Sequence, residues 1–306
     1  KSNVLGKPMK EPQNVPFEKE GQYLKSDNRS NISYFLEHNV LLRRFTLSVG
    51  VLANYNSALN EGIHFYPGID ASFRIGDNVR LYGSWNRALR MPTFTDLYYE
   101  GKTNKGNPDL KPEESEAFEV GLKYNTYFLR AHIAGFYRKG KNMIDWVKEK
   151  PEDIWESQNL TKVDNLGFET NLSLLPRELG NERFFIRKIE LGYAFIHQDK
   201  DSEGYISNYA LDYLKHKFTA QLSHSIWKGF SATWYVRWQD RAGSYTKYEN
   251  LKPAYEEPYA PYCLVDMKVN WEYQRLNLYA ELNNLLNSTY YDLGNIPQPG
   301  IWFKAG

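Results

Sequence analysis

The chain has 306 residues, of which 38 are Lys or Arg and 37 are Asp or Glu, so its formal net charge is +1 at pH 7. This near balance argues against nucleic acid as the main partner, because a phosphate backbone selects for a strong basic excess. The single cysteine, Cys263, excludes an internal disulfide framework and a multi-thiolate metal site in this sequence.

Aromatic residues make up 16% of the chain, which is a high share for a soluble domain. The sequence contains no window of about 18 consecutive apolar residues, so it predicts no transmembrane helix. A membrane β-barrel escapes this test, because only alternate side chains of its strands face lipid and the averaged hydropathy stays low.

Alternation of apolar and polar residues predicts strands along most of the chain. In the first run, Phe45, Leu47 and Val49 alternate with Thr46 and Ser48, which gives one apolar and one polar face. The pattern recurs, in chain order, at 63–75, 79–86, 118–124, 189–195, 218–222, 230–238, 265–271 and 276–282. We expect about a dozen strands, long enough to cross a membrane when tilted, which takes about 9–11 residues.

The connections between these runs alternate in length. Short connections are expected at 41–44, 76–78, 125–127, 227–229 and 272–275, and long ones at 90–113, 139–159, 199–209, 240–259 and 285–300. Alternate turns of an up-and-down meander lie at the same end, so one end has small turns and the other has large loops. This arrangement is typical of outer-membrane barrels, whereas Greek-key sandwiches do not sort their loops in this way.

Aromatic residues near the expected strand ends fit the girdles found at membrane interfaces. They are Trp85, Tyr124, Trp238, Trp271 and Tyr273. Packing of the same residues into the core of a soluble β protein is the alternative interpretation. Closure into a barrel favours the membrane reading, because it leaves no unpaired strand edge in lipid.

Two stretches carry a resemblance to a known family. The segment "RALRMPTFTDLYYEGKTNKGNPDLKPEESEAFEVGLKY" and the end "LNNLLNSTYYDLGNIPQPGIWFKAG" are similar to signatures of TonB-dependent outer-membrane receptors. The matching positions include Arg90, Pro92, Gly106, Asn107, Pro108, Leu110, Lys111, Pro112, Glu113, Glu119 and Gly121, and later Asn284, Pro299 and Gly300. We expect these motif residues to serve barrel architecture, with Pro108 and Pro112 stiffening the entry to a strand and Lys111 pairing with Glu113.

The resemblance implies an all-β, transmembrane, antiparallel up-and-down barrel in the outer membrane of a Gram-negative bacterium. The whole chain, residues 1–306, would be the rear portion of a barrel of about 22 strands, with residues 1–28 as an extracellular loop segment. The plug, the early strands and the terminal strand of the family have no counterpart in this sequence. The implied partners are outer-membrane lipids and lipopolysaccharide, the inner-membrane TonB complex, a surface lipoprotein and a small-molecule ligand, without nucleic acid.

The stretches "YALDYLKHKF", "RWQDRAGSY" and "YYDLGNIPQPG" are most similar to the cobalamin (vitamin B12) receptors of Bacteroidota within this family. Haem and ferric-siderophore receptors share the barrel and much of the signature, so they stay open as alternatives. Import would proceed by binding and gated passage, and the resemblance implies no cofactor, no metal and no catalytic residue.

Ligand contacts are expected in the long loops, because binding groups concentrate on connections held by a rigid scaffold. Aromatic faces beside amides suit a large amphipathic ligand, although loops also pack on themselves. The candidates are Tyr98, Tyr99, Asn104, Trp155, Tyr245, Tyr248 and Tyr255.

Enzymatic alternatives find little support. The six histidines are scattered, and no metalloprotease or nucleophile-elbow motif occurs in the sequence. Carboxylates on the polar side of strands leave a barrel protease or lipase as one alternative, and a passive porin or adhesin is another. The polar-side charges are Asp70, Glu119, Glu190, Asp266, Lys268 and Glu281.

Overall fold

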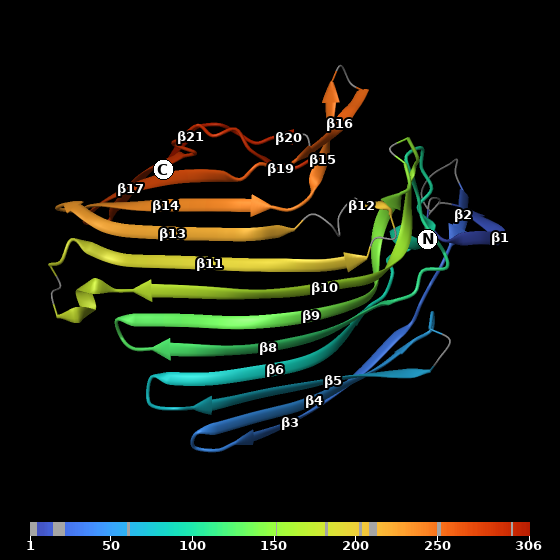
Figure 1. The fold of residues 1–306 in the computed structure, drawn as a ribbon, viewed down its shortest axis with the longest axis horizontal. Helices are drawn as coiled ribbons and strands as arrows, with labels where there is room; N and C mark the ends of the chain where they lie inside the picture. The colour runs from blue at the N-terminus through green and yellow to red at the C-terminus, as the bar shows by residue number, and fades with distance from the viewer. Residues whose placement is uncertain are drawn as a thin grey trace.

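One curved antiparallel sheet organises the chain (Figure 1). The computed structural model describes residues 5–14, 22–59, 62–150, 152–180, 183–201, 204–207, 213–249, 252–294 and 296–306. In chain order the sheet contains β3 (Asn31–Leu41), β4 (Phe45–Asn56), β5 (Ile63–Arg74), β6 (Val79–Arg90), β8 (Glu113–Asn125), β9 (Leu129–Lys148), β10 (Trp155–Leu174), β11 (Ile186–Asp201), β13 (Leu214–Trp227), β14 (Phe230–Arg241), β17 (Tyr262–Tyr273), β18 (Leu276–Asn283) and β21 (Trp302–Ala305). Each strand pairs antiparallel with the next in this order, so the meander topology predicted from the sequence is confirmed.

Smaller elements decorate this sheet. They are the hairpins β1 (Lys7–Asn14) with β2 (Gln22–Ser26), β15 (Ser244–Glu249) with β16 (Lys252–Pro258) and β19 (Tyr291–Leu293) with β20 (Ile296–Pro297), the short strands β7 (Asn104–Lys105) and β12 (Ile206–Ser207), helix α1 (Phe94–Tyr98) and the 3-10 turn η1 (Pro176–Leu179). The described residues contain no helix with the length and apolar composition that crossing a bilayer requires.

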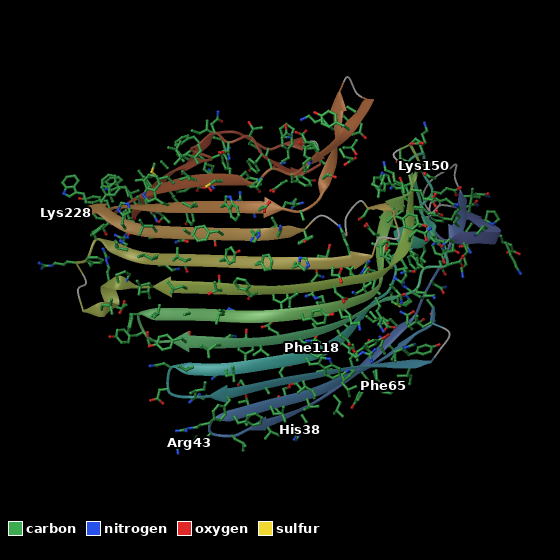
Figure 2. All side chains as sticks on the ribbon, in the orientation of Figure 1. His38, Arg43, Phe65, Phe118, Lys150 and Lys228 are labelled. Atoms are coloured by element: carbon green, nitrogen blue, oxygen red, sulfur yellow. The ribbon has the colours of Figure 1, made fainter. Side chains whose placement is uncertain are left out.

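The sorting of connections by length is also confirmed. Figure 2 shows Arg43 and Lys228 in turns at one end of the sheet and Lys150 at the other. We call these the short-turn end and the long-loop end. The connection 175–185, which contains η1, lies at the short-turn end and is longer than its neighbours there.

The predicted long loop at 139–159 is wrong. β9 and β10 stay paired as far as Val147 and Glu156, so the loop shrinks to residues 149–154. Beyond the level of the neighbouring strands this ribbon is held by a small apolar core. Val147, Leu160 and Val163 are buried in it, with Met143 and Tyr205 packed against them.

Alternation assigns the two faces of the sheet as predicted. Val120, Phe65 and Ile133 are 63%, 61% and 51% exposed, and all lie on the apolar face. In water such a continuous apolar surface would be far larger than soluble monomers tolerate. The opposite face carries the polar side chains, including all the polar-side charges predicted from the sequence. We call the apolar face the outer face and the polar face the inner face.

Aromatic residues border the outer face at both ends. At the short-turn end Trp271 stacks on Tyr273 at 5.9 Å and on Phe230 at 5.9 Å, measured between ring centroids. Towards the long-loop end Trp85 packs on Phe118 at 6.4 Å. These positions suit the aromatic girdles that flank the hydrocarbon layer.

The apolar band crosses the hydrogen-bond register diagonally. Val49 pairs with Ile69, which pairs with Trp85. On β4 three more outer positions beyond Val49 stay apolar or aromatic, whereas on β6 the next outer residue after Trp85 is Arg87. Such a drift is expected when strands tilt by about 35–45° to the membrane normal, as they do in a barrel.

Among the described strands of the main sheet, four were not among the predicted runs: β3, β9, β10 and β21. In β3 the residues Tyr34, Phe35 and Leu36 interrupt the alternation. The reason is that Phe35 lies on the inner face, opposite Leu52, and its ring occupies the space that Gly50 leaves open. The apolar ring of Phe35 on the inner face, packed over Gly50, therefore hides the alternation of apolar and polar residues along β3.

Substitution of Val49 by Lys tests the assignment of faces. Val49 lies midway along β4 on the outer face, and Val49→Lys is expected to cost about 2–4 kcal/mol of unfolding free energy. Ser48→Lys is the control, because Ser48 faces inward beside Glu37 and opposite Asp70, which favour a cation. Urea unfolding of the barrel in lipid vesicles measures both, and equal losses would contradict the assignment.

Candidate functional site

The connection between β6 and β8, residues 91–112, forms one side of the long-loop end, and we call it the rim segment. It begins with a capping box around α1: Asp96 N donates to Thr93 Oγ1 at 3.1 Å, and Thr93 N donates to Asp96 Oδ2 at 2.9 Å. Two otherwise unpaired backbone donors at the helix start are thereby satisfied. The threonine and aspartate of the family signature therefore define where the chain turns away from β6.

Gly106 brings the rim segment back against α1. Its amide donates to Tyr99 O at 2.6 Å, and the amide of Asn107 donates to Asp96 O at 2.9 Å. A Cβ at Gly106 would lie 2.8 Å from backbone atoms of Leu97 and Tyr98. Only glycine fits this close approach of two backbones without a shift of the chain.

An ion pair closes the base of the rim segment. Arg90, the last residue of β6, faces Glu113, the first residue of β8, and donates to its two carboxylate oxygens at 2.6 and 2.5 Å. Glu113 is buried and also accepts from Ile144 N at 2.8 Å. The hydrogen bonds from Arg90 to the Glu113 carboxylate raise the pKa of Arg90. The expected pairing of Lys111 with Glu113 is therefore wrong, because the register aligns Arg90 with Glu113.

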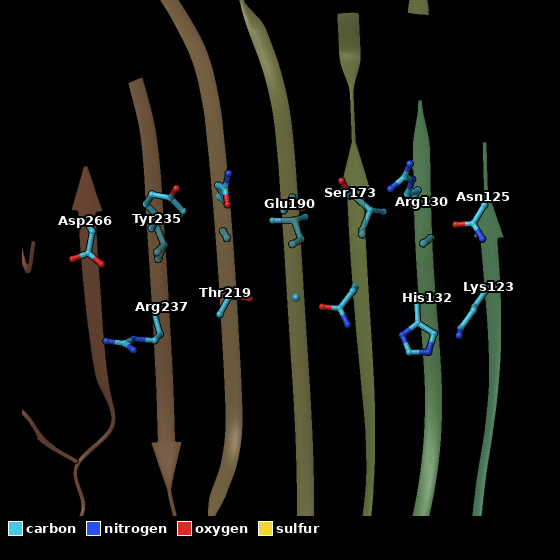
Figure 3. Close-up of a pocket in the computed structure, with 18 residues that line it drawn as sticks. Lys123, Asn125, Arg130, His132, Ser173, Glu190, Thr219, Tyr235, Arg237 and Asp266 are labelled. Carbon is cyan, nitrogen blue, oxygen red and sulfur yellow. The ribbon is translucent and has the colours of Figure 1, made fainter. Parts of the chain in front are cut away.

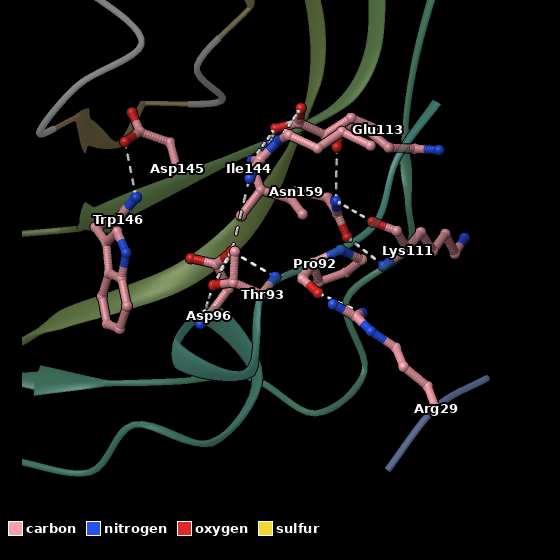
Figure 4. A network of polar contacts seen from close by, with 12 residues as sticks. Arg29, Pro92, Thr93, Asp96, Lys111, Glu113, Ile144, Asp145, Trp146 and Asn159 are labelled. Atoms are coloured by element: carbon pink, nitrogen blue, oxygen red, sulfur yellow. Dashed lines mark hydrogen bonds and ion pairs between the residues drawn. The ribbon is translucent and has the colours of Figure 1, made fainter. Parts of the chain in front are cut away.

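Asn159 ties the rim segment to β9 and β10, and sequence reasoning missed it. Its side chain accepts from Lys111 N at 2.8 Å and donates to Lys111 O at 2.9 Å and Asn142 O at 2.7 Å (Figure 4). Asn142 has a φ of 53°, a left-handed conformation that asparagine tolerates better than most residues. Leu110 is buried in the same region, while Pro108 is exposed and Pro112 half-buried.

Other motif residues make contacts within the sheet. Glu119 accepts from the hydroxyl of Tyr82 at 2.8 Å, and a Cβ at Gly121 would meet the Tyr82 ring at 2.5 Å. At the later motif, Asn284 donates to the carbonyls of Ser288 and Pro299 at 2.9 and 3.2 Å. Gly300 allows close approach to the Asn287 side chain, at 2.5 Å from a Cβ built there.

Pro92 is buried, and its carbonyl accepts from Arg29 Nη1 at 2.6 Å. Arg29 also lies over the ring of Phe94, 4.9 Å from its centroid. The segment before β3 is thus attached to the rim segment.

Within the predicted loop segment 1–28, the described residues include β1 and β2, whereas residues 1–4 and 15–21 lie outside the described part of the chain.

Tyr98 and Tyr99 line a cavity of about 310 Å³ between the β1–β2 hairpin and the rim segment. Tyr98 donates to Asp27 Oδ2 at 2.5 Å, and burial with this hydrogen bond raises the pKa of Tyr98 to about 12. Tyr99 is 38% exposed and meets Trp146 edge-on at 6.3 Å. Lys25 and Glu100 pair at 3.1 Å on the wall of the cavity.

Asn104 and Trp155 meet close to this cavity. β7 pairs in parallel with β10, and the pairing places Asn104 beside Trp155. Lys148 lies over the Trp155 ring, 4.5 Å from its centroid. Four of the seven candidate ligand residues therefore gather on one flank of the long-loop end, together with Trp146, which sequence reasoning missed.

The other three candidates lie on the opposite flank, above β14 and β17. Tyr245 is 7% exposed and packs on Tyr259 and Tyr291 at 5.1 and 5.2 Å. Tyr248 and Tyr255 are about half exposed on the β15–β16 hairpin. The structure does not bring the two groups together, because β11 and β13 separate them in the sheet.

The inner face forms a hollow of about 590 Å³ near the short-turn end. Figure 3 shows charged and polar side chains around it, from β8 to β17; they include Lys123, His132, Glu190, Arg237 and Asp266. Both signs of charge and several amides line it, as expected of a surface that faces water or polar protein rather than lipid.

Two of the inner carboxylates that line the hollow, Glu190 and Asp266, lie on separate strands. Glu190 and Asp266 belong to one row of the register but are three strand spacings apart, about 14 Å. Within the described residues, no three His, Cys, Asp or Glu side chains gather as ligands for a metal ion.

A family model described as "TonB dependent receptor-like, beta-barrel" matches residues 8–285. The chain belongs to this family. Its residues form part of the β-barrel of an outer-membrane receptor of a Gram-negative bacterium.

Two relatives that the chain resembles carry different descriptions. The receptor is 25% identical over 191 residues to the Vitamin B12 transporter BtuB of Vibrio vulnificus, which covers 57% of this chain and 30% of the relative. It is 26% identical over 226 residues to the iron-regulated outer membrane virulence protein of Vibrio cholerae, covering 65% of this chain and 33% of the relative. The chain thus spans about a third of the length of these relatives.

Among solved structures, a mutant of the ferric enterobactin receptor PfeA of Pseudomonas aeruginosa superposes with a TM-score of 0.72. The match covers 99% of this chain and 48% of that one at 19% identity. This likeness shows the shared fold. The seven candidate ligand residues and the roles of the motif residues stay predictions.

Removal of the Glu113 carboxylate tests the ion pair at the base of the rim segment. Glu113→Ala leaves Arg90 and the Ile144 amide without their acceptor, and we expect a loss of about 2 kcal/mol in local stability. Hydrogen exchange of residues 91–112 would then be about 30-fold faster. Glu114→Ala is the control, because its pair with Arg87 at 3.7 Å is exposed and worth little; equal acceleration in both variants would contradict this role.

Proposed function

We propose that the receptor binds cobalamin at its long-loop end and imports it through the barrel. The observation that carries the proposal is the gathering of Tyr99, Trp146, Asn104 and Trp155 on one flank of this end. A corrinoid is a large ring system edged with amides, so it suits aromatic faces beside an asparagine. The identity with a vitamin B12 transporter supports the same ligand.

Import would rely on energy from the inner-membrane TonB complex, acting through a plug domain. A surface lipoprotein would assist capture, in keeping with an origin in Bacteroidota. The process is binding and gated passage, without covalent chemistry. Loops that close over a ligand need a rigid scaffold, and the paired strands below the two flanks provide one.

A ferric siderophore is the second candidate ligand. A ferrienterobactin receptor of Escherichia coli is 22% identical over 297 residues, and covers 88% of this chain and 38% of the relative. Exposed cations near the 310 Å³ cavity, including Lys7 and Lys105, would favour an anionic ferric complex. Haem receptors remain a third class within the same family.

Direct binding to the intact receptor decides among these ligands. Cyanocobalamin, haem and ferric enterobactin are titrated separately against the detergent-purified protein, with tryptophan quenching or calorimetry as the readout. We expect cyanocobalamin to bind most tightly, because an amide-edged ring system matches the aromatic and asparagine side chains of this flank. Tight binding of haem or of the siderophore without binding of cobalamin would overturn the ligand assignment.

Truncation of Tyr99 tests the location of the site. Tyr99→Ala removes a partly exposed ring from the flank, and we expect about tenfold weaker binding of the preferred ligand. Tyr127→Ala is the matched control, because Tyr127 is 71% exposed in a turn at the short-turn end. An unchanged affinity in Tyr99→Ala, or an equal loss in Tyr127→Ala, would place the ligand elsewhere.

A further inference from the structure

The connection between β10 and β11, residues 175–185, is longer than its neighbours at the short-turn end and contains η1. Import through the lumen, as proposed above, does not use it. Binding groups concentrate on connections that a rigid scaffold holds, so this segment is a candidate for a second role. Residues 175–188 carry an excess of basic side chains, with Arg177, Arg183, Arg187 and Lys188 against Glu178 and Glu182, the last of which lies outside the described residues.

Two guanidinium groups of this region converge on one hydroxyl group. Arg177 Nη2 donates to Ser225 Oγ at 2.6 Å, and Arg187 Nε donates to the same oxygen at 2.9 Å. Arg177 Nε also donates to Phe184 O at 2.9 Å, and Ser225 N donates to Phe185 O at 2.7 Å. The connection is therefore fastened to β13, and both cationic groups are held beside each other. We call Arg177, Arg187 and Ser225 the arginine pair site.

Within the described part of the chain, no carboxylate forms an ion pair with either arginine of this site. Glu178 follows Arg177 in the sequence but is exposed, and Glu190 pairs with Lys188 at 2.8 Å. Two like charges held around a neutral hydroxyl repel each other. An anion placed between them would relieve this repulsion.

The arginine pair site also keeps donors for such an anion. A guanidinium group has five N–H bonds, and the contacts above use two of those of Arg177 and one of those of Arg187. The Ser225 hydroxyl accepts from both arginines, so its own proton is left to donate to a further acceptor. Donors from three side chains therefore surround one position, and charge-assisted hydrogen bonds of this kind are the strong ones.

The register places the Ser225 side chain on the inner face of the sheet. Ser225 pairs with Ser231, which pairs with Asn270, two residues from the inward Lys268. The strand partner of Ser225 is thus uncharged, and its hydroxyl lies on the lumen side rather than the lipid side. The short turns of outer-membrane barrels face the periplasm, so the arginine pair site stands at the periplasmic mouth of the barrel.

Apolar side chains stand close in sequence to both arginines. Leu179, two residues after Arg177, is 58% exposed, and Phe185, two residues before Arg187, is 57% exposed. A dissolved inorganic anion has no use for such neighbours. A peptide that carries both carboxylates and apolar side chains matches the two kinds of surface together.

We propose that Arg177 and Arg187, held by Ser225, bind a carboxylate of an acidic peptide segment at the periplasmic mouth of the barrel. Leu179 and Phe185 contact apolar side chains of the same segment. The arginine pair site is at the opposite end of the barrel from the aromatic flank, so it does not depend on which ligand is imported.

Binding of a synthetic peptide to the intact receptor in detergent tests the site. The probe is a dye-labelled peptide of alternating Glu and Leu residues, followed by fluorescence anisotropy. Arg177→Ala with Arg187→Ala is expected to bind the peptide about tenfold more weakly, because the loss of a charge-assisted contact amounts to about this factor. A peptide with Gln in place of each Glu is expected to bind the unmodified receptor as weakly.

The matched control is Arg43→Ala with Arg44→Ala, which removes the same charge from an exposed turn at the same end. We expect this control to bind the peptide as the unmodified receptor does. Ser225→Ala keeps both cations but removes the oxygen on which they converge, and we expect binding to be about fivefold weaker. Urea unfolding of each variant shows whether its barrel is intact, and Ser225→Ala decides if the double alanine variant is destabilised.

Several results would overturn the proposal. They are no binding of the Glu peptide to the unmodified receptor, normal binding by the double alanine variant or by Ser225→Ala, an equal loss in the control, and equal binding of the Gln peptide. A lipid headgroup is the competing occupant. Displacement of the peptide by phosphatidylglycerol in nanodiscs, but not by phosphatidylcholine, would assign the arginine pair site to lipid instead.

Discussion

Backbone hydrogen bonding in a hydrocarbon layer is the constraint on which the rest of the structure depends. Water is absent there, so each amide and carbonyl of a membrane-crossing segment needs a partner within the sheet. Each strand of the main sheet between β4 and β18 pairs with a neighbour on both sides, and β3 and β21 form the two edges of the described sheet. Successive side chains of a strand point to opposite faces, so the register decides which of them meet lipid and which meet the lumen. A slip of the register by one residue would exchange the two faces.

Outside the hydrocarbon layer the same chain is held by side chains instead. At the long-loop end Glu113 receives Arg90 and the amide of Ile144, and Asn159 takes up both backbone groups of Lys111. These contacts fix where the rim segment leaves and re-enters the sheet. The family signature therefore concentrates at the exits from the membrane, where the strand ladder no longer dictates the path of the chain.

Residues of the same type have different surroundings, which depend on their position along the strand and on the face of the sheet that carries them. Tyr137 lies on the outer face at the edge of the hydrocarbon, Tyr245 is buried in a cluster above β14, and Tyr99 is partly exposed beside a cavity. Lysines divide in the same way: Lys123 lines the inner hollow, while Lys141 points to the lipid side. Composition alone therefore overstates the number of aromatic residues open to a ligand.

The sequence by itself determined the strand class, the two faces, the sorting of the connections and the family, because each follows from local periodicity, turn residues or ordered motifs. It did not determine which side chains meet across the rim. The partner of Glu113, the burial of Tyr245 and the extension of β9 and β10 depend on residues that are distant in the sequence. Only the register of neighbouring strands brings those residues together, and that register is a property of the whole sheet.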